Sequence, residues 1–163
     1  DKFNFDFDEQ EKGKICDFLE EDIDDKYYYS SRFKVYDEVQ FFIKGRDRKY
    51  KIYSITAFID YDTYIYNCHK KVNKLDKELS AILNDAKRWR DTGKHPADKS
   101  GKSIIKQIYY DLKSGGGAII GCINWSSKMD YPDFLFIYLD SKEFRQRWST
   151  DGCGIGSMCY NRY

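Results

Sequence analysis

The chain has 163 residues, of which 41% are hydrophobic, and this length and composition predict one domain with a single core. No apolar run approaches the roughly 18 residues of a membrane span, so the composition argues against a membrane protein. The net charge of +1 hides an asymmetry, because residues 1–30 carry eleven acids and four bases whereas the rest carries 24 bases and 16 acids. The sequence therefore predicts an acidic N-terminal arm on a basic body. Either both are simply solvated, or the basic body attracts anions such as phosphates.

Five cysteines are spread widely along the chain, and none has the paired Cys-x-x-Cys spacing of a zinc site. Two histidines do not complete such a site, so neither a metal nor another cofactor is expected. Wide spacing is typical of one or two long-range disulfides in a secreted protein, with one thiol left over. The glycosylation sequence Asn124-Trp125-Ser126 is compatible with secretion. The cysteines are Cys16, Cys68, Cys122, Cys153 and Cys159.

Residues 1–31 predict a short strand or extended arm, followed by a short acidic helix that ends before three consecutive tyrosines. Strand signals are dense in residues 32–72. The clearest is a hairpin, in which alternating apolar residues at 39–43 and 50–55 flank a turn at 44–47. The other strands expected in this part of the chain are 33–36 and 63–68.

The main helix is predicted at residues 73–92, because apolar residues recur there at i, i+4, i+7, i+11 and i+14. Asn73 is expected to cap its first turn, where Asp76 adds a favourable charge. Gly93 ends the helix and Pro96 prevents its resumption. The apolar stripe is interpreted as core and consists of Leu75, Leu79, Ile82, Ala86 and Trp89.

Residues 103–163 are rich in strand and turn signals. Strands are predicted at 103–112, 118–123 and 133–139, and the last is nearly continuously apolar, as expected for the centre of a sheet. Three consecutive glycines, 115–117, predict a wide turn, and the tail is an irregular segment held by cysteines. Together these elements predict an α+β fold in which one main helix packs on an antiparallel sheet within a single domain, with an N-terminal extension.

His95 and Asp111 are the candidate catalytic residues. Histidine is the natural acid or base near neutral pH, although an isolated loop histidine is more often simply solvated. Asp111 would be a general base in a basic cleft, whereas at an outward strand position it is an ordinary surface carboxylate. A candidate surface for single-stranded RNA combines cations for phosphates with aromatic rings for base stacking. The alternative interpretation of the same residues is a solvated, lysine-rich face. The candidate surface consists of Lys99, Lys102, Lys106, Tyr109 and Tyr110.

Three short motifs follow one another in the second part of the chain. Tyr66-Asn67-Cys68 stands just before the predicted helix, Lys94-His95-Pro96-Ala97 follows it, and Tyr109-Tyr110-Asp111-Leu112 comes next. In this order they resemble the fungal guanyl-preferring ribonucleases and, more closely, the RNase-like secreted effectors of powdery mildew fungi. In that family the motifs are Tyr-x-Cys, a Tyr-Pro-His or Tyr-Pro-Ala element, and a Tyr-Tyr-Glu segment with the catalytic base. The resemblance covers about residues 60–163.

The resemblance implies a ribonuclease-like fold and a disulfide between Cys68 and a late cysteine, Cys159 or Cys153. The active enzymes use a carboxylate base for the ribose 2′ proton, a histidine acid for the leaving oxygen and an arginine that stabilises the phosphorane. Here Asp111 is one methylene shorter than glutamate, the expected central strand carries no arginine, and no histidine follows His95. The resemblance therefore implies the scaffold of the RNase-like effectors without the chemistry of the enzymes.

We expect a secreted, effector-like virulence protein of a fungal pathogen that binds a host protein, such as an immune receptor, or RNA. A protein partner would use exposed Tyr, Trp and Arg anchors, whereas RNA binding would weaken steeply with salt. The protein is expected to be a monomer without a membrane partner. Two alternatives stay open. One is an active ribonuclease that uses His95 and Asp111, with Arg145 or Arg147 in place of the missing arginine. The other is an intracellular viral or phage host-takeover protein, suggested by a composition rich in Lys, Asp and Tyr and poor in Pro.

Overall fold

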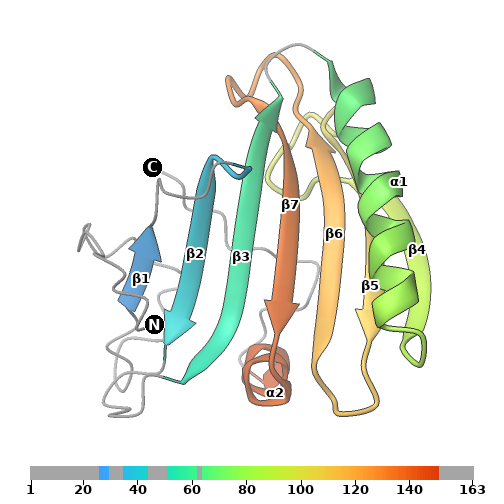
Figure 1. The fold of residues 1–163 in the computed structure, drawn as a ribbon. Helices are drawn as coiled ribbons and strands as arrows, with labels where there is room; N and C mark the ends of the chain where they lie inside the picture. The colour runs from blue at the N-terminus through green and yellow to red at the C-terminus, as the bar shows by residue number, and fades with distance from the viewer. Residues whose placement is uncertain (1–25, 30–34, 44–50, 62–63, 151–163) are drawn as a thin grey trace.

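The computed structural model describes residues 26–29, 35–43, 51–61 and 64–150. Seven strands form one antiparallel sheet in the order β1-β2-β3-β7-β6-β5-β4, and helix α1 lies across one face of it (Figure 1). The expected α+β architecture, with one main helix on an antiparallel sheet, is confirmed. The elements are β1 (Lys26–Tyr29), β2 (Glu38–Ile43), β3 (Ile52–Tyr61), α1 (Ile65–Ile82), β4 (Lys87–Lys94), β5 (Ile104–Asp111), β6 (Gly117–Asn124), β7 (Asp133–Asp140) and α2 (Lys142–Thr150).

The chain leaves the middle of the sheet at the end of β3 and returns to the middle only at β7. Helix α1 carries it to the far edge, where β4 begins, and β4 to β7 then run back as a meander (Figure 1). As a result β7 pairs with both β6 and β3, and it is the central strand, as its apolar sequence predicted. The predicted hairpin is also confirmed, because β2 pairs with β3 through Phe41 opposite Ile55.

The main helix begins earlier and ends earlier than predicted. Residues 65–82 are helical rather than 73–92, so Tyr66 and Cys68 lie in the first turns of α1 instead of in a strand. Asn73 lies in the helix interior and caps nothing. The apolar stripe continues toward the N-terminus through Val72 and Cys68, which are buried, whereas Ile82 is 75% exposed. The helix is therefore positioned by the stripe that packs on β6, and residues 87–94 are free to form a strand.

Two strands predicted before the main helix are not observed as predicted, and two predicted segments cannot be compared with the structure. The strand expected at 63–68 is wrong, because this segment opens α1. Residues 35 and 36 of the strand expected at 33–36 are not extended in the sheet, and the other two lie outside the described residues. The acidic arm and helix before residue 26, and the cysteine-bearing tail after residue 150, also lie outside the described residues.

The sheet is apolar on both faces around β6, which is buried from Gly117 to Ile123. Gly121 is required there, because a Cβ at this position would lie 2.6 Å from the carbonyl oxygen of Lys106 and 2.5 Å from the ring of Phe136. Alternation along the strands divides the core between the two faces. The face under α1 holds Cys68, Val72, Ile108, Tyr110, Ala118, Ile120, Cys122 and Leu135. The opposite face holds Phe58, Ile105, Tyr109, Ile119, Ile123, Trp125, Phe134 and Phe136.

A disulfide joins the helix to the sheet, as a bond between Cys68 of α1 and Cys122 of β6. The pairing of Cys68 with Cys159 or Cys153 that the resemblance implied is therefore wrong. Because α1 lies over β6, the Cα atoms of Cys68 and Cys122 are 6.1 Å apart, which suits a disulfide. Both side chains are essentially inaccessible to solvent, at 0% and 1% exposure.

Candidate functional site

Strand β4 forms one edge of the sheet (Figure 1). It is the most exposed of strands β2 to β7. Seven of its eight residues are exposed, and only Gly93 is half-buried. The strand carries four bases and one acid, Asp91. We refer to residues 87–94 as the β4 edge. Its position, exposure and charge make it the candidate binding surface of this protein.

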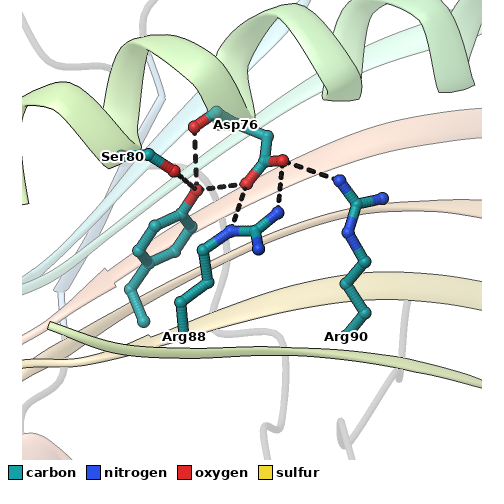
Figure 2. Close-up of polar contacts among 5 residues, drawn as sticks. Asp76, Ser80, Arg88 and Arg90 are labelled. Carbon is teal, nitrogen blue, oxygen red and sulfur yellow. Dashed lines mark hydrogen bonds and ion pairs between the residues drawn. The ribbon is translucent and has the colours of Figure 1, made fainter.

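A polar network fastens the β4 edge to the helix. Figure 2 shows the carboxylate of Asp76, on α1, between the guanidinium groups of Arg88 and Arg90. Nε of Arg88 donates to Oδ1 of Asp76 at 2.7 Å, and Nη2 of Arg90 donates to Oδ2 at 2.7 Å. Tyr110 of β5 donates its hydroxyl to the same carboxylate, and Ser80 lies 3.2 Å from that hydroxyl oxygen. One buried carboxylate therefore organises groups from α1, β4 and β5.

The electrostatics of this network favour an ionised Asp76. Burial alone would raise the pKa of Asp76, but hydrogen bonds from Arg88 and Tyr110 and the charges of both arginines lower it below its ordinary value. Burial and the hydrogen bond to Asp76 raise the pKa of Tyr110, so its hydroxyl stays protonated and can donate. The arginine side chains remain partly in water, at 35% exposure for Arg88 and 56% for Arg90. They are held in place and still accessible to a partner.

Trp89 is the aromatic residue of the β4 edge. Its ring is stacked on that of Tyr109 across the strand pair, with centroids 4.8 Å apart and an interplanar angle of 7°. The ammonium of Lys87 lies 5.8 Å from the centroid of the Trp89 ring, at the distance of a cation–π contact. Trp89 is nevertheless 37% exposed, whereas Tyr109 beneath it is 8% exposed. A contact by a partner would therefore be made with Trp89.

The expected RNA surface is only partly formed. Lys99, Lys102 and Lys106 are exposed, as a cationic surface requires. Tyr109 and Tyr110 are buried, at 8% and 1% exposure, so their rings are not available to stack on bases. The reason is their place in β5, where Trp89 covers one ring and α1 covers the other. This part of the prediction is corrected.

The two candidate catalytic residues lie at opposite ends of β5. The amide of His95 bonds the carbonyl of Ser103, just before β5, whereas Asp111 is the last residue of the strand. At about 3.3 Å per residue this places them roughly 25 Å apart. Asp111 does meet Arg145, at 2.6 Å, but this pair has no histidine beside it. The structure therefore does not bring His95, Asp111 and Arg145 into one site.

His95 is enclosed by a loop rather than solvated. Its side chain is 2% exposed, and its ring centroid lies 4.4 Å from that of Trp125. Asp98 closes the same loop, since its carboxylate accepts bonds from the amide of Ser103 at 2.9 Å and from the hydroxyl of Ser126 at 2.9 Å. Hydrogen bonds from Ser103, Ser100 and Ser126 hold the pKa of Asp98 well below its ordinary value. These contacts assign a structural role to both residues.

The burial of His95 predicts a pH dependence of stability. Burial lowers the pKa of His95, with a smaller opposing effect of Asp98. The contribution of a neutral His95 is therefore fully present above the unfolded value of about 6.5 and is lost as the pH falls toward the folded-state pKa. Between about pH 7.5 and about pH 5.5 we expect the free energy of unfolding to fall by at most about 1.4 kcal/mol from this group.

Urea unfolding at the two pH values measures this effect. His95→Gln should remove most of the difference between the two pH values, whatever its effect on stability at either one. His69 affects the pH dependence in the same direction, because burial, followed by the charge of Lys106, lowers its pKa as well. We expect the larger effect from His95, because His69 is only half-buried. Equal stability of the native protein at both pH values would contradict the burial of a neutral His95.

The residues of the polar network were not among the candidates from the sequence. The sequence pattern places Asp76 in the first helical turn and Trp89 in the helix core, so it indicates no role for Arg88 and Arg90. The sequence does indicate a strand after the helix, because Asn84-Asp85 is a turn sequence and Trp89 and Thr92 favour strands. An end of the helix at the asparagine would have placed both arginines on the same face of a strand.

Within the described ranges, no three His, Cys, Asp or Glu side chains come together as metal ligands. Of the two described helices, neither is long and apolar enough to cross a membrane. Comparison with known proteins finds no family model, no curated protein and no solved structure that matches this chain.

Proposed function

We propose that this protein is a secreted, effector-like binding protein that acts by binding a protein of its host. The observation that carries the proposal is the β4 edge, where Arg88 and Arg90 on one face of the sheet and Trp89 on the other are exposed and held by the fold. Tryptophan and arginine are the residue types that dominate binding energy at protein interfaces. Because Asp76 and Tyr109 already hold these side chains, little conformational entropy would be lost on binding.

Secretion is supported by the bridge between Cys68 and Cys122. Stable disulfides are typical of oxidising compartments, so a buried bridge is compatible with an extracellular protein. The helix-on-sheet plan is also compatible with a ribonuclease-like scaffold, whose helix packs on an antiparallel sheet. We propose that such a scaffold serves here for binding without catalysis. The distance between His95 and Asp111, and the pairing of Asp111 with Arg145, support this proposal.

RNA is the second candidate partner, and it rests on the exposed Lys99, Lys102 and Lys106. Without Tyr109 and Tyr110 as stacking platforms, binding would depend on phosphate contacts. Affinity would then fall steeply with salt and show little dependence on base sequence. A protein partner that uses Trp89 would show a weaker salt dependence.

Selection from a library of displayed random peptides tests the proposed function on the folded, disulfide-bonded protein. We expect enriched peptides whose affinity falls at least about tenfold in the double variant Trp89→Ala, Arg90→Ala. The matched control is Lys99→Ala, Lys102→Ala, which changes two exposed residues outside the β4 edge and should leave peptide affinity unchanged. Enriched peptides that bind both double variants like the native protein would contradict the proposal.

A single-stranded RNA of about 20 nucleotides, at about 50 and about 200 mM salt, tests the alternatives on the same sample. We expect neither cleavage nor saturable binding at micromolar protein. Binding lost with salt and with Lys99→Glu, Lys102→Glu would favour the RNA function. Cleavage lost in His95→Ala would show an active ribonuclease.

A further inference from the structure

Among the described residues, no strand pairs with the outer edge of β4. Within the described part of the chain, β5 is the one strand paired with β4. The strand lies at the end of the sheet, and seven of its eight residues are exposed. A row of free N–H and C=O groups on such a strand is a template for another strand.

The register shows which residues point outward. The amide of His95 bonds the carbonyl of Ser103 at 2.9 Å, one residue beyond the β4–β5 ladder and in its register, so this bond indicates which pairs of the ladder are hydrogen-bonded. In an antiparallel ladder such pairs alternate along the strand, so Trp89 opposite Tyr109 is also a bonded pair. The residues that alternate with the bonded ones direct N–H and C=O away from β5. These are Arg88, Arg90, Thr92 and Lys94.

The same alternation places three cations at the free edge, on the face of the sheet that carries α1. Asp76 compensates one charge of the Arg88–Arg90 pair, so a positive surplus remains there together with Lys94. A second copy of the chain, adding β4 to β4, would oppose cations to cations, and like charges opposite each other destabilise strand pairing. An acidic strand would instead place carboxylates against these side chains.

The other face of the edge is apolar at Trp89. Its ring lies on Tyr109 and retains 37% of its exposure. In an added strand, the side chains on this face would alternate with those facing the arginines. A β-branched or aromatic side chain beside Trp89 would cover the exposed part of the ring. The edge therefore selects for alternation of acidic and apolar residues.

We propose that the β4 edge accepts an extended, acidic segment of a partner protein as an eighth strand of the sheet. Backbone bonds to Arg88, Arg90, Thr92 and Lys94 provide affinity, and alternating carboxylates and apolar side chains provide specificity. The inference rests on the proposed function and names the chemistry of the partner. It requires neither movement of the sheet nor loss of the bonds between β4 and β5.

A synthetic peptide of about ten residues that alternates glutamate and valine is the probe, and fluorescence anisotropy measures its affinity. The comparison peptide has the same composition with the glutamates and valines in two blocks. We expect the alternating peptide to bind at least about tenfold more tightly. Equal affinity of the two peptides would overturn the proposal, because charge alone would then explain the binding.

A pair of substitutions at Thr92 tests the backbone contact. Thr92→Pro removes an outward N–H but none that bonds β5, and proline is tolerated at such edge positions. Thr92→Val keeps the N–H and is the matched control. We expect Thr92→Pro to weaken peptide binding at least about tenfold and Thr92→Val to change it less than about twofold. Equal affinities of these two variants would exclude strand addition.

Hydrogen exchange on the native protein keeps the proposal testable if the proline variant fails to fold. Bound peptide should slow exchange of the amides of Arg88, Arg90 and Thr92, whereas the amide of Trp89 is already bonded to β5. Unchanged exchange at the three outward amides would overturn the proposal. Library peptides that depend on Trp89 and Arg90 but ignore Thr92→Pro would leave the proposed function standing and remove strand addition.

Discussion

Replacing Cys68 and Cys122 together by alanine is expected to lower the free energy of unfolding by about 4 kcal/mol. The bridge closes a loop with a sequence separation of 54 residues, and restricting a loop of this length in the unfolded chain accounts for that value. Both sulfurs lie between α1 and β6, so the variant also loses packing in the core. Urea unfolding of the variant and of the oxidised protein measures the difference.

The control for this prediction is the native sequence reduced in denaturant and refolded with reductant present. It keeps both sulfur atoms, so its loss of stability reports the cross-link without the change in volume. We expect most of the effect to appear in this sample. Free thiols at Cys68 and Cys122 in the purified native protein, or equal unfolding midpoints with and without reductant, would show that the bridge does not form.

Asp76→Asn is expected to lower the free energy of unfolding by about 2 kcal/mol. The substitution keeps the size of the side chain but removes the charge that faces Arg88 and Arg90, and it replaces an acceptor by a donor. Breaking a fully buried ion pair costs about 3–5 kcal/mol, and the value here is smaller because both arginines remain partly in water. Thermal and urea unfolding measure the loss.

Arg90→Ala is the matched control, because its side chain is 56% exposed and makes one of the contacts to the carboxylate. We expect it to cost less than about 1 kcal/mol. The loss of stability at acidic pH gives a second measurement. The pKa of Asp76 is lowered in the folded state, so its contribution is present above the unfolded value of about 3.9 and disappears as the pH falls through the folded-state pKa. Equal acid sensitivity of Asp76→Asn and the native protein would contradict the network.

The strands of the second half of the chain could be predicted because each carries its own local signal. Apolar residues and flanking turns mark β5, β6 and β7 to within two residues of their observed bounds. The central place of β7 also follows from its sequence, since a strand covered on both faces has no polar alternation. The hairpin of β2 and β3 could also be predicted from local sequence, because its two strands are close in the chain.

The helix and the β4 edge show what local patterns leave open. Leu75 and Leu79 belong to the helix stripe, but the same spacing continues by coincidence to Ala86 and Trp89, beyond the end of α1. The contacts that decide whether residues 87–94 continue the helix or form a strand are non-local. Asp76 lies 12 residues from Arg88 and 34 from Tyr110, and sequence spacing carries no information about such pairs. The disulfide is a further case, because five cysteines allow many pairings.

The place of β7 between β3 and β6 also bears on the order in which the chain can fold. The ladder that joins the two halves of the sheet runs from Tyr61 opposite Asp133 to Ser54 opposite Asp140, so it closes over long stretches of chain. Pairing within β1 to β3 and within β4 to β7 needs only neighbouring strands, whereas the ladder between β3 and β7 must wait until β7 is synthesised. On a ribosome, the N-terminal hairpin would leave the exit tunnel with its apolar edge uncovered until β7 followed. This interval is when the chain is most exposed to wrong strand pairing and most dependent on chaperones.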